Sequence, residues 1–299
     1  MENEKIRMKV GIRLNKEDKS LRQQRTISKA IAYAGIGLHS GKAVEIRLLP
    51  AAIDYGIKFL RTDIAQAQPI SAKVTNVTDT LRATTIANAV GTHVFTVEHL
   101  LAALAVLNID NCLVEISSPE PPVADGSAKV FLDLLEQAGI EEQVASVQEF
   151  CLPEVVAVYD ADKYICALPY DGFRISFTSI NNHPLLGTQH YDLVVSEAAC
   201  KTEIAPARTI GFMHEVEMLK KMGLGLGGSL ENVVVYDEKS VLTPLRFEDE
   251  LVRHKILDVI GDLSLVGKIK AHIIAVKSSH ALNIQLAKKI NELKNLEGK

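Results

Sequence analysis

The sequence predicts an α+β protein of two similar halves that meet near residue 148, each combining a β-sheet layer with a pair of helices. Two observations support this prediction. Short runs typical of strands, in which apolar and polar residues alternate, are interspersed with longer runs typical of helices. In several places successive strands are separated by turns rather than helices, which argues against a purely parallel, doubly wound sheet. The length of 299 residues allows two domains of ordinary size.

The first half contains four predicted elements. The run AVEIRLLPA alternates as a strand does, whereas TVEHLLAALAVL has no helix breaker and is apolar on most faces, as a buried helix is. A proline-rich turn follows the next strand, and Asp125 or Ser127 can cap the helix after it. In chain order we expect a strand over residues 43–51, a helix over 96–107, a strand over 111–118 and a helix over 128–138.

The second half begins where the pattern loosens, over residues 141–153. The runs EVVAVYD, YICALPY and FRISFTSI are typical of strands, and a glycine-rich loop, GLGLGGS, precedes a further strand, NVVVYD. In chain order we expect strands over 154–160, 164–170 and 173–180, a helix over 211–221, the loop over 223–229, a strand over 232–237, a helix over 247–266, a strand over 272–279 and a helix over 282–293.

Residues 1–23 are predicted to be an N-terminal extension. A short strand pattern runs through it, formed by Ile6, Met8, Val10, Ile12 and Leu14. Acidic residues in the same segment count against a mitochondrial-type transit peptide. We interpret the segment as a frayed arm or the product of an upstream translation start, with a membrane-surface contact as the alternative.

Composition excludes several functional classes. The net charge of −4 argues against a nucleic-acid binder that neutralises phosphates, and we find no apolar run long enough to span a bilayer and no secretory signal. The four cysteines lie far apart with no CxxC pair, so we expect reduced core thiols in a cytoplasmic protein. A bound metal would therefore need histidine and carboxylate ligands.

The clearest candidate site lies in the predicted helix RFEDELVRHKILDVIGDLSLVG. His254, Asp258 and Asp262 follow one another at intervals of four and therefore share one face of this helix. A His-x-x-x-Asp pair on one face can hold a divalent metal, and ionisable groups on an otherwise apolar helix need partners. The alternative is a simple intrahelical His–Asp pair.

Glu98 and His99 lie at the start of the other apolar helix. Taken alone, Glu98 is explained as a first-turn carboxylate facing the helix dipole, and His99 as a half-buried histidine. Taken together with His254 and Asp258, His99 completes three ligands that leave an open position for water on zinc. Glu98, the neighbour of a ligand, is then well placed to take a proton from that water.

Two further segments contain candidate residues. His280 is expected at the end of the strand in KSSHALNI, with Asn283 just beyond, and the alternative is a polar turn histidine. In PARTIGFMHE, Thr209 follows Arg208 before a turn. Its hydroxyl is expected either to donate a hydrogen bond to an oxyanion or simply to cap a helix.

Several of these motifs together, in this order, resemble one known family. They are GIGLHSG, TVEHLLAAL, DNCLVEI with PPVADGSA, ARTIGF, GLGLGGS, LRFEDELVRHKILDVIGDL and KSSHALN. The set resembles the UDP-3-O-acyl-N-acetylglucosamine deacetylases, the zinc amidases of lipid A biosynthesis in Gram-negative bacteria. The resemblance covers residues 24–293, nearly the whole chain.

The resemblance implies two similar domains, each a β-sheet layer packed on a pair of helices, with the active site between them. Domain I covers residues 24–147 and supplies Glu98 and His99, and domain II covers residues 148–299. An insert at about residues 210–235 of domain II is implied to line a hydrophobic passage for the acyl chain rather than to bind a nucleotide. Its candidate lining residues are Met213, Val216, Leu224 and Leu226.

The resemblance also implies roles for single residues. It implies that His99, His254 and Asp258 bind Zn²⁺ and that Glu98 is the general base. His280 resembles the family's catalytic histidine, an imidazolium that stabilises the oxyanion or protonates the leaving amine. Asp262 is implied to orient that histidine and to keep it positively charged. Lys255 and Thr209 are implied to contact the substrate or the oxyanion.

The activity implied is hydrolysis of the N-acetyl group of UDP-3-O-[(3R)-3-hydroxyacyl]-N-acetylglucosamine, which releases acetate in the committed step of lipid A biosynthesis. We expect a cytoplasmic monomer that binds this UDP-acyl-GlcNAc substrate and no nucleic acid. The chain departs from the family at Ile210, where an aromatic residue is common, and at Ser279, where glycine is common. The alternatives are a zinc amidase for another nucleotide sugar or a shorter acyl chain, and a binding protein without activity.

Overall fold

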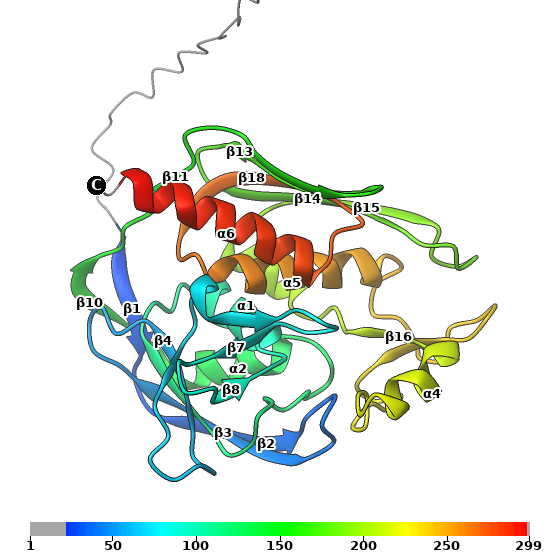
Figure 1. Ribbon diagram of the computed structural model, residues 1–299, viewed down its shortest axis with the longest axis horizontal. Coiled ribbons are helices and arrows are strands. Elements are labelled where there is room, and N and C mark those ends of the chain that lie inside the picture. Colours follow the sequence, from blue (N-terminus) through cyan, green and yellow to red (C-terminus); the bar gives the residue numbers. More distant parts are fainter. Residues whose placement is uncertain (1–21, 298–299) are drawn as a thin grey trace, which may run out of the picture.

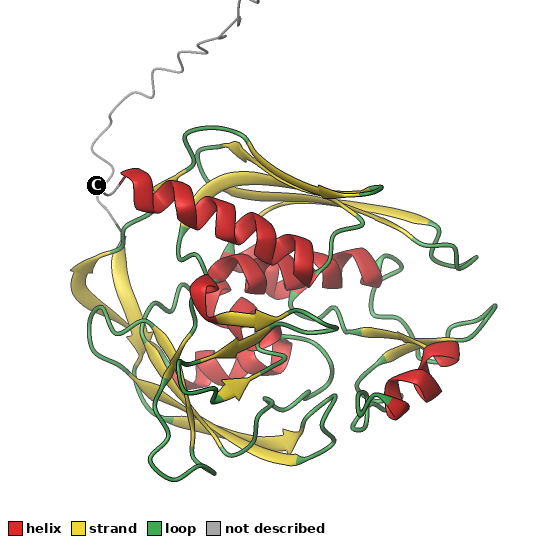
Figure 2. Cartoon of the chain, in the orientation of Figure 1, coloured by secondary structure: helices red, strands yellow, loops and turns green. Residues whose placement is uncertain are grey.

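The computed structural model describes residues 22–297, which form an α+β fold (Figure 2). The strand pattern expected between Ile6 and Leu14 lies outside these residues. Four layers follow one another in the view of Figure 1: a sheet, the helices α6 and α5, the helices α1 and α2, and a second sheet. These four helices therefore lie between the two sheets, whereas α4 lies at the side of the molecule. Within the described residues no helix is long and apolar enough to cross a membrane.

The sheet of the first half has the strand order β2-β3-β9-β4-β5. β4 and β9 are parallel, and the other neighbours in this order are antiparallel. In β3 exposed and buried residues alternate, as the pattern AVEIRLLPA predicts. The strands are β2 (Ile31–Ile36), β3 (Ala43–Pro50), β4 (Ile57–Arg61), β5 (Ile70–Ser71) and β9 (Cys112–Ile116).

The sheet of the second half has the order β12-β13-β18-β14-β15, and again only one pair in this order, β14 and β18, is parallel. The two sheets thus share strand order and strand directions, and in each half the strand that runs parallel to an earlier one lies between two helices in the chain. The strands are β12 (Val156–Asp160), β13 (Lys163–Pro169), β14 (Phe173–Ile180), β15 (Thr188–Val194) and β18 (Ile269–Val276), with β11 (Phe150–Cys151) paired to β18.

This repeated topology supports two similar halves, and the boundary near residue 148 stays a prediction. Buried apolar residues of both halves form one continuous core between the sheets. The predicted helices are present as α1 (Glu98–Val106), α2 (Lys129–Ala138), α5 (Glu250–Ser264) and α6 (His280–Glu297). α1 is buried on almost every face, as its composition predicts.

The other elements connect or cover these layers. β1 pairs with β10, β6 to β8 form a small sheet, and β16 pairs with β17 beside α4. Their bounds are β1 (Gln23–Ile27), β6 (Val77–Asp79), β7 (Thr85–Ala87), β8 (His93–Val94), β10 (Ile140–Ser146), β16 (Ile210–Phe212), β17 (Val234–Tyr236), α3 (Glu197–Ala199) and α4 (Met213–Lys221), with short helical turns at Val74–Asn76 and Cys200–Ile204.

The structure adds two strands and corrects two local predictions. β10 and β11 lie where the sequence pattern loosens, and they are hidden in the sequence because β10 has only partly buried and exposed side chains. The helix predicted from residue 211 begins at Met213, since Gly211 and Phe212 pair in β16. His280 is the first residue of α6 rather than the end of a strand, because the apolar helical pattern begins only at Leu282.

The four cysteines are free thiols, as predicted, but they are not all in the core. Cys112 and Cys200 are buried, and burial raises the pKa of each thiol to about 12. Cys166 is half-buried, and Cys151 is exposed because its side chain lies on the face of β11 opposite to that of the buried Phe150, so the prediction of core thiols is wrong for Cys151.

Gly261 allows α5 to lie directly against the start of α1. A Cβ atom built at Gly261 would lie 2.1 Å from the carbonyl oxygen of Glu98. Replacing Gly261 by alanine is expected to lower the free energy of unfolding by about 1–3 kcal/mol, because the helices must separate. Alanine itself favours a helix by about 1 kcal/mol over glycine, so the loss would report this contact. Denaturant unfolding measures it, and unchanged or increased stability would contradict the close approach.

Candidate active site

His99, His254 and Asp258 form a buried cluster between α1 and α5. One ligand-type atom from each of the three lies within 4.8 Å of the other two. His254 and Asp258 are one turn apart on α5, which places both on the side that contacts α1. The rings of His99 and His254 meet edge to face, with centroids 4.9 Å apart. The packing of two helices thus brings together residues more than 150 positions apart in the chain.

The hydrogen bonds of the cluster fit a bound metal ion. Asp258 Oδ1 is buried without a hydrogen-bond partner among the described residues, and it lies 3.5 Å from His254 Nε2 and 3.8 Å from His99 Nε2. A buried carboxylate oxygen without a donor is costly unless a cation satisfies it. His254 Nδ1 donates to the carbonyl of Ala207 (3.0 Å), which leaves Nε2 as the free ligand atom. Two imidazole nitrogens and one carboxylate oxygen are a zinc-type donor set.

The protonation states of the cluster also suit a metal. Burial lowers the pKa of His99 to about 3, and it lowers the pKa of His254 as well, so both imidazoles are neutral near pH 7. Burial opposes the charge of Asp258, but Lys255, with Nζ 2.9 Å from Oδ2, and the nearby histidines hold the pKa of this carboxyl below its ordinary value. Neutral imidazoles and an ionised carboxylate are the forms that bind divalent cations.

Glu98 is the first residue of α1 and lies next to His99 in the chain, with an exposed fraction of 3%. Its Oε2 accepts a hydrogen bond from the backbone N–H of Thr84 (3.1 Å). Its Oε1 lies 3.9 Å from His280 Nε2. Burial raises the pKa of Glu98 to about 7, although the positive charge of His280 opposes the shift. Such a carboxyl exchanges a proton readily near neutral pH.

The partly buried His280 forms a charged pair with the fully buried Asp262. His280 Nδ1 donates to Asp262 Oδ2 (2.9 Å), and Asn283 Nδ2 donates to the same oxygen (2.9 Å). Burial alone would lower the pKa of His280, but the charges of Asp262 and Glu98 outweigh it and raise the pKa to about 10. His280 is therefore an imidazolium at neutral pH, with Nε2 turned toward Glu98.

The chain matches the family UDP-3-O-acyl N-acetylglycosamine deacetylase over residues 24–292. It belongs to this family. Proteins named UDP-3-O-acyl-N-acetylglucosamine deacetylase are 48% identical in Myxococcus xanthus (89% of this chain and 86% of that protein) and 44% identical in Shewanella denitrificans (89% and 88%). The protein of that name in Haemophilus influenzae is 44% identical over 90% of both chains. The family predicted from the ordered motifs is thus confirmed.

Thr209 lies two residues after Ala207, whose carbonyl accepts the hydrogen bond of His254. Its backbone N–H donates to Gly126 (2.8 Å), and its carbonyl accepts from Val234 (2.9 Å). The preceding Arg208 is buried and forms a bidentate ion pair with Glu250 at the start of α5 (Nε–Oε1, 2.8 Å). These contacts fix the backbone of this segment, and the role predicted for the Thr209 hydroxyl stays a prediction.

The predicted acyl-passage residues divide between a helix and a loop. Met213 and Val216 lie on α4, whereas Leu224 and Leu226 lie in the glycine-rich loop after it. Met213 and Leu226 are about half exposed, and the segment exposes three further large apolar side chains that the sequence reasoning missed: Met218, Met222 and Leu230. Exposed apolar residues gathered in one short segment are typical of a binding surface.

The glycine-rich loop is attached to the GIGLHSG motif of the first half. Gly225 N–H donates to His39 Nδ1 (3.3 Å), and Leu226 N–H donates to the His39 carbonyl (3.2 Å). A Cβ at Gly227 would lie 2.2 Å from the carbonyl oxygen of Gly37, so only glycine permits this approach. These two motifs of the deacetylase family, far apart in the sequence, thus meet at one contact.

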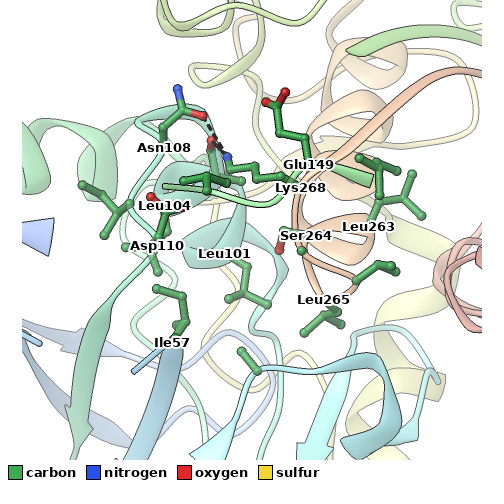
Figure 3. Close-up of a pocket in the computed structure, with 18 of the residues that line it drawn as sticks. Ile57, Leu101, Leu104, Asn108, Asp110, Glu149, Leu263, Ser264, Leu265 and Lys268 are labelled. Atoms are coloured by element: carbon green, nitrogen blue, oxygen red, sulfur yellow. Dashed lines mark hydrogen bonds between the residues drawn. The ribbon is translucent and has the colours of Figure 1, made fainter. Parts of the chain in front are cut away.

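A pocket with a volume of ≈ 970 Å³ lies at the other ends of α1 and α5 (Figure 3). Leu101 and Leu104 of α1 and Leu263 of α5 contribute to its lining, and none of the predicted site residues lines it. Lys268 Nζ donates to Asn108 Oδ1 and to the Ala105 carbonyl (both 2.9 Å), and burial lowers the pKa of this lysine to about 8. The pocket is separate from the candidate active site.

Proposed function

We propose that this protein hydrolyses the N-acetyl group of UDP-3-O-[(3R)-3-hydroxyacyl]-N-acetylglucosamine with the help of Zn²⁺ and releases acetate, the committed step of lipid A biosynthesis. The observation that carries the proposal is the buried cluster of His99, His254 and Asp258 beside Glu98 and His280. It occurs in a chain that matches the deacetylase family over residues 24–292.

The three cluster residues would hold the zinc ion. When bound there, zinc supplies Lewis-acid polarisation of the amide carbonyl and makes water a better nucleophile near neutral pH. Glu98, next to ligand His99, takes the proton of the attacking water. Its pKa of about 7 suits a general base, because a good base is deprotonated at the working pH and still accepts a proton.

His280 acts on the oxyanion and on the leaving group. Its imidazolium stabilises the developing oxyanion, and it or Glu98 protonates the leaving glucosamine nitrogen. Asp262 keeps His280 charged and oriented through the hydrogen bond at Nδ1. Lys255, whose ammonium lies beside Asp258, and Thr209 are proposed to contact the substrate or the oxyanion.

The acyl chain is proposed to lie against the insert of residues 210–235, where Met213, Val216, Leu224 and Leu226 supply apolar surface. We further propose a cytoplasmic monomer with a domain boundary near residue 148. The four free thiols are in keeping with a reducing compartment.

Acetate release from the purified protein tests the proposed function. We expect acetate release from UDP-3-O-(3-hydroxyacyl)-N-acetylglucosamine, loss of this activity after chelation, and recovery when Zn²⁺ is added back. The reason is that His99, His254 and Asp258 are proposed to act by holding the metal ion.

The matched control substrate is UDP-N-acetylglucosamine without the acyl chain, which should react poorly if the insert binds that chain. Equal rates on substrates that differ only in the acyl group would favour an amidase for other nucleotide sugars. A zinc-loaded protein that releases no acetate from any of them would favour a binding protein.

A further inference from the structure

Thr84 contacts two carboxylates of the candidate active site at once. It lies at the end of the loop between β6 and β7 and is completely buried. Its hydroxyl donates to Asp262 Oδ1 (2.6 Å), and its backbone N–H donates to Glu98 Oε2 (3.1 Å). Asp262 belongs to α5 and Glu98 to α1, so one residue joins the acidic groups of both helices.

At Asp262 the Thr84 hydroxyl completes the hydrogen bonding of a fully buried carboxylate. His280 and Asn283 both donate to Oδ2, and Thr84 donates to Oδ1. An ionised carboxylate only accepts hydrogen bonds, so the hydroxyl must be the donor, and such charge-assisted bonds are short and strong. Donors on both oxygens prevent the carboxylate from rotating, which keeps Oδ2 directed at His280 Nδ1.

At Glu98 the Thr84 backbone N–H donates a hydrogen bond to one of the two otherwise equivalent carboxylate oxygens. Because Oε2 accepts this bond, the oxygen that faces His280 Nε2 is Oε1, at 3.9 Å. The two contacts of Thr84 therefore fix the orientation of the Glu98 carboxylate relative to the His280 imidazole. The loop that contains Thr84 belongs to neither helix.

We propose that Thr84 is a positioning residue that orients the Asp262–His280 pair and selects Oε1 of Glu98 as the oxygen that takes the proton. Thr84 acts through these side chains and does not itself touch the reacting atoms. The inference rests on the proposed function, since it assigns the roles of acid and base to His280 and Glu98.

The test compares Thr84→Val with Thr84→Ser. Valine has the shape of threonine and keeps the backbone N–H but lacks the hydroxyl, whereas serine keeps the hydroxyl. We expect Thr84→Val to lower kcat about 10–100-fold, as loss of an outer partner of a site residue typically does. KM, zinc content and Tm should change little, and Thr84→Ser should restore most of kcat.

A double-mutant cycle with Asp262→Asn shows whether Thr84 acts through Asp262. If it does, Thr84→Val should cost much less in the Asp262→Asn background than in the wild type. Equal losses in both backgrounds would overturn the proposal, and so would a Thr84→Val enzyme with wild-type kcat.

Proton NMR of the His280 Nδ1–H tests the orienting role without any assay of activity. We expect its resonance to shift or exchange faster in Thr84→Val and to stay in place in Thr84→Ser. If Thr84→Val does not fold, Thr84→Ala is measured in the same way. An unchanged resonance would overturn the inference, whereas an inactive wild type with the expected resonance shifts would overturn the proposed function alone.

Discussion

Replacing Glu98 by glutamine is expected to lower kcat about 10²–10⁴-fold while the bound metal persists, because loss of a general base typically costs that much. The amide has nearly the same size as the carboxylate, and its oxygen can still accept the hydrogen bond from Thr84 N–H, but it cannot accept the proton of the attacking water. Metal analysis and acetate release on the same preparation measure the two quantities.

The control for this variant is Glu115→Gln, which changes a partly exposed glutamate on β9 that pairs with Arg47. We expect it to leave kcat unchanged, because an exposed ion pair contributes little. Two outcomes would contradict the assignment of Glu98. Full activity of Glu98→Gln would show that another group takes the proton, and loss of zinc would show that Glu98 supports the metal site instead.

Replacing His280 by glutamine is expected to lower kcat about 10²–10⁴-fold and to remove the decline of activity at high pH. In the proposed reaction Glu98 acts deprotonated and His280 acts protonated. Activity should therefore rise with pH through the pKa of Glu98, about 7, and fall through the pKa of His280, about 10. A bound cation favours the ionised form of Glu98 and so moves the rising limb to lower pH.

Asp262→Asn is the matched variant for the pH profile. It removes a negative charge that raises the pKa of His280, so the decline at high pH should begin at a lower pH than in the wild type. The measurement is kcat from pH 5 to 11 for the wild type and both variants. A wild-type profile without a limb on either side would contradict the assignment of base and acid.

Much of the fold follows from local sequence patterns. The alternation in AVEIRLLPA and the unbroken apolar run after Thr96 correspond to β3 and α1, because one buried face of a strand and an all-round buried helix leave distinct periodicities. β10 has no such signal, since its side chains are exposed or only partly buried. Its partner β1 lies more than 100 residues away, and the pairing is visible only in the folded chain.

The candidate site, like the fold, could be predicted from the sequence only in part. The interval of four between His254 and Asp258 predicts that both share a helix face, and the structure places them together with His99. The sequence does not show that α6 starts at His280, because the apolar period that predicts this helix begins only at Leu282. The sequence carries no signal for Thr84 either, since this residue lies in a loop without a motif.

The sequence by itself determined the fold class, the family and the residue types of the candidate metal site, because these depend on local periodicity and on motifs in a given order. Only the tertiary structure decided that Asp258 Oδ1 lacks a hydrogen-bond partner within the described residues, that burial raises the pKa of Glu98 to about 7, and that Thr84 bonds two carboxylates. The physical reason is that desolvation and hydrogen bonding depend on every group packed around an atom, and here those groups come from distant parts of the chain.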